Sequence, residues 1–385
     1  MKVIYFGSIS TTDCDFPLLR SYKKKGIDFV AYFTLADWNK QSGLICVNEM
    51  IKSDTILKAS EIDAFKVYES YINLDNIYII NSFHHRRNQW QSWILWIKVL
   101  IHMYKQKADI FHCVWPPSKQ EKILYLLPLK RILTVHDPFP HSSGMNLSKE
   151  KNRVTAFKKF EKLVLLNNVQ MSEFKKYYKI REGKVESNQL GEYDCIRYIH
   201  DTEVSTNTKY ILYFGQIQSH KGVEFLLEAM TLVHKKNPQV KLIIAGKGHY
   251  YFDVKPYEGL DYIVFLNRYI PVPELANLLG ECLFVVCPYK DATQSGVVQT
   301  AFSAGVPLVV TNVGNMPNEV KDRVLGLVVP PCDAMALSNA MNELIGSPNL
   351  LVQFKENIEK LWRPSMSWDP IAEKYIEMYK DLLSE

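Results

Sequence analysis

The chain has 385 residues, of which 47% are hydrophobic and 23% charged, a composition typical of a folded globular protein with room for two domains. The seven cysteines are odd in number and form no Cys-x-x-Cys pair, which argues against a disulfide framework or zinc site and favours a reducing cytosol. Met1–Ser8 has the pattern of a β-strand rather than a signal peptide, and no apolar run approaches the ~18 residues needed to cross a bilayer. We therefore expect a soluble protein, or one that sits on a membrane without crossing it.

The formal net charge of +5 is unevenly spread along the chain. Lys and Arg outnumber Asp and Glu in residues 1–200, whereas acidic residues are in excess in the remainder. This asymmetry predicts two domains with different partners. The basic half could face anionic lipid, a phosphorylated acceptor or nucleic acid, or its lysines could be scattered over a solvated surface.

The first half of the sequence alternates short apolar runs with stretches of helical spacing. Alternation of this kind predicts βαβ units and a parallel sheet. The expected strands cover residues 3–6, 29–33, 77–80, 110–114, 132–135 and 163–166.

The segment 88–107 stands apart because apolar residues cover most of the circumference of the helix that it predicts. One face carries large apolar residues at helical spacing, namely Trp90, Trp93, Ile94, Ile97, Ile101 and Tyr104. This helix could lie on a membrane surface with aromatic and basic anchors, or it could pack between the sheet and its neighbours. We favour packing, because wide apolar coverage marks burial as often as membrane contact.

A polar stretch at 198–208 is the best candidate for a linker, and the alternating pattern restarts after it. The expected strands of the second half cover 210–214, 240–245, 262–265, 283–287, 307–311 and 326–329, and the expected helices cover 222–236, 272–280, 296–304 and 333–345. Two successive doubly wound α/β halves explain this order better than one large sheet.

Two helix starts in the second half carry residues suited to bind a diphosphate. Lys221 and Gly222 follow a strand and open a helix, where a cation and backbone N–H groups can jointly hold an anion. Ser295 and Gly296 repeat this arrangement at a later helix start. Taken singly, each could be a surface lysine or an ordinary N-cap serine. Glycines after neighbouring strands favour a nucleotide-diphosphate site instead, at Gly246, Gly248 and Gly314.

The order of these motifs resembles the C-terminal domain of the retaining group 1 glycosyltransferases of the GT-B fold, often called family 4. The resemblance is strongest over residues 209–345, and it rests on Phe214-Gly-x-Ile-x-x-x-Lys221-Gly, Ala245-Gly-x-Gly248, Ser295-Gly-Val, Ala304-Gly-x-Pro-x-Val-x-Thr, Val313-Gly, Glu319-Val and Gly326-x-Val-Val-Pro. In the first half it rests on Thr134-Val-His-Asp-Pro-Phe-Pro-His141 and Asn188-Gln-Leu-Gly-Glu-Tyr193.

The resemblance implies an α/β chain of two Rossmann-like, doubly wound domains that face each other across a cleft. Residues 1–200 would bind the acceptor and residues 201–365 the nucleotide-sugar, while residues 366–385 would form a helix that returns to the first domain. The family needs no metal or other cofactor.

The resemblance also assigns roles to individual residues of this sequence. Lys221 would neutralise the leaving diphosphate and His136 would lie against the donor sugar, so these two are the catalytic candidates. The donor-binding candidates are Gly215, Gln216, Gly246, Gly248, Arg268, Ser295, Gly296, Val297, Val298 and Glu319, with base contacts expected from Asn267–Tyr269. The acceptor-binding candidates are Ser8, Asp137 and His141.

The sequence departs from the family at three positions. Many members carry an arginine at the position of Gln216 and a pair of glutamates at the positions of Ala292 and Thr300. The second glutamate commonly holds the ribose, so another carboxylate, such as Asp291 or Glu319, would have to do so here.

The resemblance implies a retaining hexosyltransferase that uses a UDP- or GDP-sugar and a saccharide acceptor attached to a polyprenyl diphosphate, in bacterial surface polysaccharide synthesis. We expect it in the cytoplasm or on the inner face of the membrane. A non-catalytic GT-B protein that binds nucleotide or glycan as a partner subunit remains open, because of the three departures. An epimerase is disfavoured by the lack of a carboxylate pair, a dehydrogenase by the sequence after Gly7, and nucleic-acid binding by the absence of a compact basic stripe.

Overall fold

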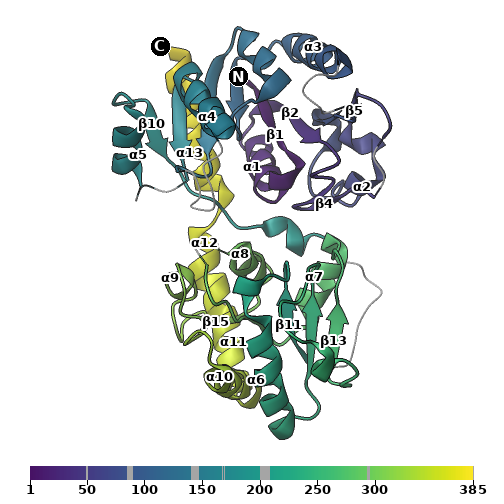
Figure 1. Ribbon diagram of the computed structural model, residues 1–385. Coiled ribbons are helices and arrows are strands. Elements are labelled where there is room, and N and C mark those ends of the chain that lie inside the picture. Colours follow the sequence, from purple (N-terminus) through teal and green to yellow (C-terminus); the bar gives the residue numbers. More distant parts are fainter. Residues whose placement is uncertain are drawn as a thin grey trace. The chain divides into compact units, whose positions relative to one another are not determined.

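The computed structural model describes residues 1–48, 51–84, 90–139, 147–166, 168, 170–199, 209–292 and 295–384. The chain divides into two compact units, one formed by Met1–Gly191 with Ser367–Glu385 and the other by Glu192–Met366. Both units are α/β, with a parallel sheet at the centre and helices around it (Figure 1).

The sheet of the first unit has the strand order β10-β9-β8-β7-β1-β2-β6-β5, and its described strand pairs are parallel except β5 with β6. The strands are β1 (Lys2–Ser8), β2 (Asp28–Leu35), β5 (Thr55–Lys58), β6 (Ile77–Asn81), β7 (Ile110–Cys113), β8 (Lys130–Val135), β9 (Lys162–Leu165) and β10 (Val185–Ser187). A separate hairpin joins β3 (Gln41–Ser42) and β4 (Ile45–Cys46). The helices are α1 (Thr12–Lys24), α2 (Asp63–Lys66), α3 (Trp90–Tyr104), α4 (Leu147–Lys159), α5 (Met171–Tyr178) and α13 (Trp368–Ser384).

The second unit has the strand order β13-β12-β11-β14-β15-β16, and all its described strand pairs are parallel. The strands are β11 (Tyr210–Phe214), β12 (Lys241–Ala245), β13 (Ile263–Leu266), β14 (Val285–Cys287), β15 (Leu308–Thr311) and β16 (Gly326–Val329). The helices are α6 (Val223–Lys236), α7 (Val272–Glu281), α8 (Gly296–Ser303), α9 (Met316–Val320), α10 (Ala334–Gly346), α11 (Pro348–Asn357) and α12 (Arg363–Ser365). The strand order reverses between β11 and β14, which is where open α/β sheets bind ligands.

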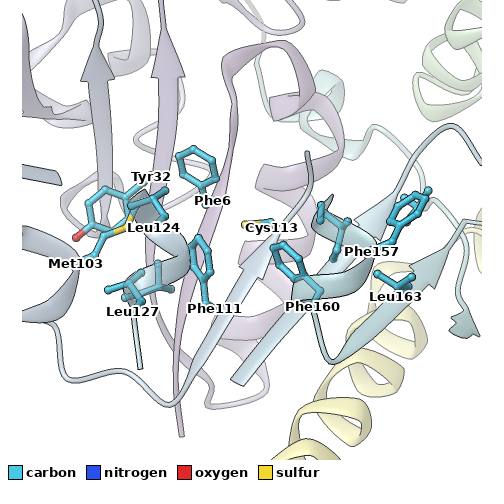
Figure 2. Packing of buried hydrophobic residues seen from close by; sticks show 14 of the residues in the cluster. Phe6, Tyr32, Met103, Phe111, Cys113, Leu124, Leu127, Phe157, Phe160 and Leu163 are labelled. Carbon is cyan, nitrogen blue, oxygen red and sulfur yellow. The ribbon is translucent and has the colours of Figure 1, made fainter. Parts of the chain in front are cut away.

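One face of the first sheet is covered by a core rich in aromatic side chains (Figure 2). Phe6 of β1 and Phe111 of β7 lie side by side, and Phe160 stacks on Phe111 with ring centroids 6.4 Å apart. Met103 of α3 packs into the same cluster. The expected strands of the first half are therefore buried, as their apolar composition requires.

Helix α3 is only half buried, which corrects our interpretation that it packs between the sheet and its neighbours. Leu95, Trp96, Val99 and Met103 point into the core. The opposite face leaves large apolar side chains in solvent, namely Trp90, Trp93, Ile94, Ile97, Ile101 and Tyr104. The apolar pattern covers both faces, so the sequence alone could not distinguish the buried face from the exposed one.

The first unit ends earlier than the expected boundary at residue 200, because the segment after Gly191 is tied to the second unit. Glu192 forms ion pairs with Arg197 at 2.5 Å and with Arg363 at 3.3 Å. The backbone N–H of Tyr193 donates to Ser303 Oγ at 2.8 Å. These contacts place the change of unit before the 198–208 stretch, of which residues 200–208 lie outside the described part.

A network of buried side chains fixes helix α13 to the sheet of the first unit. Tyr379 Oη lies 2.6 Å from His112 Nδ1 and 2.7 Å from Tyr22 Oη. His112 Nε2 lies 2.8 Å from Thr134 Oγ1, which is 2.9 Å from Tyr375 Oη. Burial lowers the pKa of His112 to about 3, so its ring is neutral at pH 7.

Replacement of Tyr379 by phenylalanine is expected to destabilise the first unit by roughly 1–3 kcal/mol, because His112 Nδ1 and Tyr22 Oη lose their shared partner in the core. Urea unfolding of the full chain measures this change. The matched control is Tyr177→Phe at an exposed position, which is expected to change little. Equal effects of the two substitutions would contradict a stabilising role for the network.

Candidate active site

The loops that follow β11 and β12 in the second unit touch each other through glycines. Gly215 has φ +118° and Gly246 has φ +153°, and a Cβ on Gly246 would lie 1.9 Å from the carbonyl oxygen of Gly215. A Cβ on Gly248 would lie 2.2 Å from the carbonyl oxygen of Ile217. Only glycine permits these contacts, so the three glycines shape the rim of the site whether or not they touch a ligand.

Lys221 lies at the switch point between β11 and β14 and is half-buried. Its Nζ lies 3.8 Å from the centroid of the Tyr289 ring. Burial lowers the pKa of Lys221, and no carboxylate within the described part of the chain pairs with it. An aromatic face attracts an ammonium group without neutralising it. Lys221 therefore has no carboxylate partner among the described residues that would compete with an anionic ligand, whereas Lys290 nearby is paired with Glu224 at 2.7 Å.

Helix α8 begins beside this lysine. Tyr289 Oη lies 3.3 Å from Ser295 Oγ, and a Cβ on Gly215 would lie 3.3 Å from Val297 Cγ2. Gly296 is exposed and is the first residue of α8, so its N–H has no acceptor within the helix. Val298 differs from our prediction, because it is buried and its N–H donates to the Ser295 carbonyl at 3.1 Å.

Glu319 of α9 supplies a carboxylate to the same region of the second unit. Asn315 Nδ2 donates to Glu319 Oε1 at 3.1 Å, but Oε2 is buried and has no partner among the described residues. Burial raises the pKa of Glu319. Both Glu319 and Lys221 influence the pKa of the Cys287 thiol at the end of β14, so both lie near that strand end. A buried, unsatisfied carboxylate oxygen is suited to accept a hydrogen bond from a ligand hydroxyl.

Two predicted donor-binding side chains have partners of their own. Arg268 is exposed and forms a bidentate pair with Glu274, with distances of 2.8 and 2.5 Å. Gln216 Oε1 accepts from Gln218 Nε2 at 2.9 Å, which leaves the amide group of Gln216 available to a ligand. Asn267 bridges both backbone groups of Gly248 at 3.0 Å and so fixes the loop after β12.

In the first unit, His136 follows β8 and lies against Trp115. The two rings stack, with centroids 5.0 Å apart and an interplanar angle of 12°. Burial lowers the pKa of His136 to about 4, although Asp137 acts in the opposite direction. His136 Nε2 has no partner among the described residues. A neutral imidazole with a free ring nitrogen can exchange a hydrogen bond with a substrate hydroxyl.

His136 lines a cavity of about 450 Å³ at the carboxyl ends of β1, β7 and β8. Ser8 and Asp137 line it too, and the Ser8 hydroxyl also accepts from Asn39 Nδ2 at 3.0 Å. The cavity thus brings His136, Ser8 and Asp137 together, while His141 lies outside the described residues. Its walls are mostly apolar, and they include Trp38 and Trp115.

Replacement of Trp115 by alanine is expected to raise the pKa of His136 from about 4 toward the ordinary 6.5, because water then reaches the ring and solvates its charged form. NMR titration of the His136 Cε1–H resonance measures this. Trp38→Ala is the control, since Trp38 lines the same cavity but is 71% exposed, and its loss should leave the pKa near 4. An unchanged pKa in Trp115→Ala would contradict shielding by the stacked ring.

Sequence reasoning missed Tyr289 and Trp115, the two aromatic residues that hold Lys221 and His136. Each follows a strand end, as the predicted site residues do, but an aromatic residue there carries no motif of its own. Among the described residues, no group of three or more His, Cys, Asp and Glu side chains is arranged to hold a metal. None of the described helices is long and apolar enough to cross a membrane.

Residues 208–347 match the family model described as glycosyl transferases group 1. A relative described as an uncharacterized glycosyltransferase from Methanocaldococcus jannaschii is 28% identical over 193 residues, covering 48% of this chain and 48% of that protein. The O-antigen chain mannosyltransferase C of Escherichia coli is 25% identical over 198 residues, covering 50% of this chain and 52% of that protein. The matched region thus spans about half the length of these curated relatives.

Among solved structures, HepE from Anabaena in complex with UDP and glucose has a TM-score of 0.65 and 14% identity, and the match covers 99% of this chain and 100% of that one. At this identity the likeness concerns the fold. It shows the two Rossmann-like domains of GT-B glycosyltransferases, as the sequence predicted.

Proposed function

Because residues 208–347 form a group 1 glycosyltransferase domain in a chain that has the GT-B fold, we propose that the protein is a retaining, metal-independent hexosyltransferase. The donor is a UDP- or GDP-sugar bound by the second unit, and the acceptor is a saccharide bound by the first. HepE was solved with UDP and glucose, which supports a nucleotide-sugar donor for this chain.

The observation that carries the proposal is that a lysine side chain and a carboxyl oxygen, each without an ion-pair partner among the described residues, lie near the same strand end of the second unit. Lys221 faces the ring of Tyr289 and no carboxylate of the described residues, and Glu319 has one buried carboxyl oxygen without a partner among those residues. A nucleoside diphosphate needs a cation for its phosphates and an acceptor for its ribose hydroxyls. Glu319 thereby takes the place of the ribose-binding glutamate, since Thr300 stands at that position and its hydroxyl bonds to the Gly296 carbonyl at 2.8 Å.

The reaction breaks the bond between the sugar C1 and the diphosphate oxygen and forms one between C1 and an acceptor hydroxyl oxygen. The acceptor loses its proton, and the nucleoside diphosphate leaves with the electron pair of the broken bond. Lys221 and the free N–H groups at the start of α8 stabilise that developing negative charge. In many enzymes a metal ion supplies this stabilisation, and we propose that these groups do so here.

The acceptor side of the proposal rests on the cavity of the first unit. Trp115 and Trp38 offer apolar faces on which sugar rings can lie, and His136 can bond to a sugar hydroxyl. We place the acceptor on a polyprenyl diphosphate and the enzyme in bacterial surface polysaccharide synthesis, in the cytoplasm at the inner face of the membrane. The similarity to an O-antigen mannosyltransferase supports this assignment.

Incubation of the protein with a panel of UDP- and GDP-hexoses and a saccharide acceptor linked to polyprenyl diphosphate tests the proposal. Chromatography is expected to show release of one nucleoside diphosphate without added metal, and NMR of the product is expected to show the anomeric configuration of the donor. Release that requires Mg²⁺ would refute metal independence, and an inverted product would refute retention.

A second candidate is a non-catalytic GT-B subunit that binds nucleotide or glycan. It is favoured by the uncharged residues Gln216, Ala292 and Thr300, which replace charged residues of the family. Binding of a nucleoside diphosphate without turnover of any sugar in the panel would favour this candidate over the transferase.

A further inference from the structure

We propose that the exposed face of helix α3 docks on the surface of an anionic lipid bilayer. Docking itself does not require the transfer reaction, and only its purpose, delivery of the enzyme to a lipid-linked acceptor, rests on the proposed function.

Helix α3 has two apolar faces with different surroundings. Leu95, Trp96, Val99 and Met103 belong to the core of the first unit. On the opposite side, Trp90, Trp93, Ile94, Ile97, Ile101 and Tyr104, which we call the α3 stripe, are between 41% and 67% exposed. Single exposed apolar residues are common on protein surfaces, but a continuous stripe along four turns of a helix marks an interaction site.

The surroundings of the α3 stripe are basic. Trp93 lines a groove together with Lys119, Lys122 and Lys151, and none of the described residues that line this groove is acidic. Among the described residues, neither Lys122 nor Lys151 pairs with a carboxylate, and Glu150 beside Lys151 pairs with Arg153 at 3.7 Å. The helix itself contains no Asp or Glu, and its exposed Lys98 lies on the flank of the stripe away from Trp93.

This combination fits a bilayer surface better than a protein partner. Tryptophan and tyrosine favour the boundary between headgroups and acyl chains, isoleucines enter the apolar layer, and lysines meet anionic headgroups. With 15 residues, α3 is too short to span the apolar layer but long enough to lie on it. A second copy of the chain fits less well, because a two-fold contact would set the groove lysines against their own copies.

Co-sedimentation with vesicles, without donor or acceptor, tests this proposal. The protein is expected to bind vesicles of phosphatidylcholine with phosphatidylglycerol, to bind phosphatidylcholine alone weakly, and to be released by salt. Ile97→Ser with Ile101→Ser is expected to weaken binding about tenfold or more. The matched control is Val352→Ser with Leu361→Ser, which removes two exposed apolar residues from the second unit and should leave binding unchanged.

A second variant, in which two groove lysines are replaced, tests vesicle binding independently if Ile97→Ser with Ile101→Ser fails to fold. Lys122→Gln with Lys151→Gln is expected to weaken binding roughly fivefold per lysine, whereas Lys235→Gln with Lys236→Gln at the end of α6 should change little. Equal binding by these two variants would overturn the proposal. So would a dimer in sedimentation velocity that Ile97→Ser with Ile101→Ser dissociates, because the stripe would then be covered by a second copy.

Discussion

Replacement of Lys221 by alanine is expected to lower kcat roughly 30- to 1000-fold, which corresponds to about 2–4 kcal/mol of transition-state stabilisation. Lys221 faces the Tyr289 ring and no described carboxylate, so its charge is free to act on the leaving diphosphate. Because that negative charge develops in the transition state, kcat should fall more than KM rises. Initial-rate measurement of donor consumption tests this expectation.

The control for Lys221→Ala is Lys235→Ala, which removes an exposed lysine from the C-terminal end of α6, the helix that begins two residues after Lys221, and should leave both constants unchanged. Near-wild-type turnover in Lys221→Ala would contradict the assignment. A loss confined to KM would show that Lys221 binds the donor without stabilising the leaving group.

Replacement of Gly222 by alanine is expected to destabilise the second unit by about 2–4 kcal/mol. Gly222 has φ +63°, in the left-handed region, and caps the start of α6. A Cβ there would lie 2.0 Å from the carbonyl oxygen of Pro288, so the loop after β14 would have to move. Urea unfolding of the full chain, followed by a probe in the second unit, measures the effect.

The matched substitution is Gly280→Ala, near the end of α7, where a Cβ would meet no atom within 4 Å. It is expected to leave stability unchanged or raise it by roughly 0.5–1 kcal/mol, because alanine favours a helix over glycine. Similar destabilisation by both substitutions would mean that the backbone at Gly222 is not strained by a side chain.

The fold could be predicted in some detail because buried parallel strands have a simple pattern. Each strand expected in the second half appears within two residues of its predicted start, from β11 to β16. The strands that were missed, β3, β4, β5 and β10, have two to four residues each and are only partly apolar, so they carry no pattern that separates them from loops. Helix α6 begins at Val223, one residue later than expected, because Gly222 adopts a left-handed conformation. The sequence alone does not show this backbone conformation.

Sequence motifs marked the glycines and the lysine of the candidate site, but they did not mark the aromatic residues that contact its side chains. The backbone at Gly215, Gly246 and Gly248 leaves no room for a side chain or has a conformation that favours glycine. These residues are therefore visible as a glycine motif in the sequence. Tyr289 acts on Lys221 through the face of its ring, across 68 residues of sequence, and no spacing rule predicts such a contact. The sequence also suggested that Arg268 binds the donor. In the structure Arg268 pairs with Glu274, which lies six residues further along the chain.

Calorimetric titration with UDP, GDP, ADP and dTDP, first without metal and then with Mg²⁺, tests the central claim most directly. We predict that UDP or GDP binds without metal, that Lys221→Ala weakens this binding, and that Glu319→Gln weakens it by loss of the ribose contact. Failure of all four nucleotides to bind the wild-type chain, with or without Mg²⁺, would contradict a nucleotide-sugar site in the second unit.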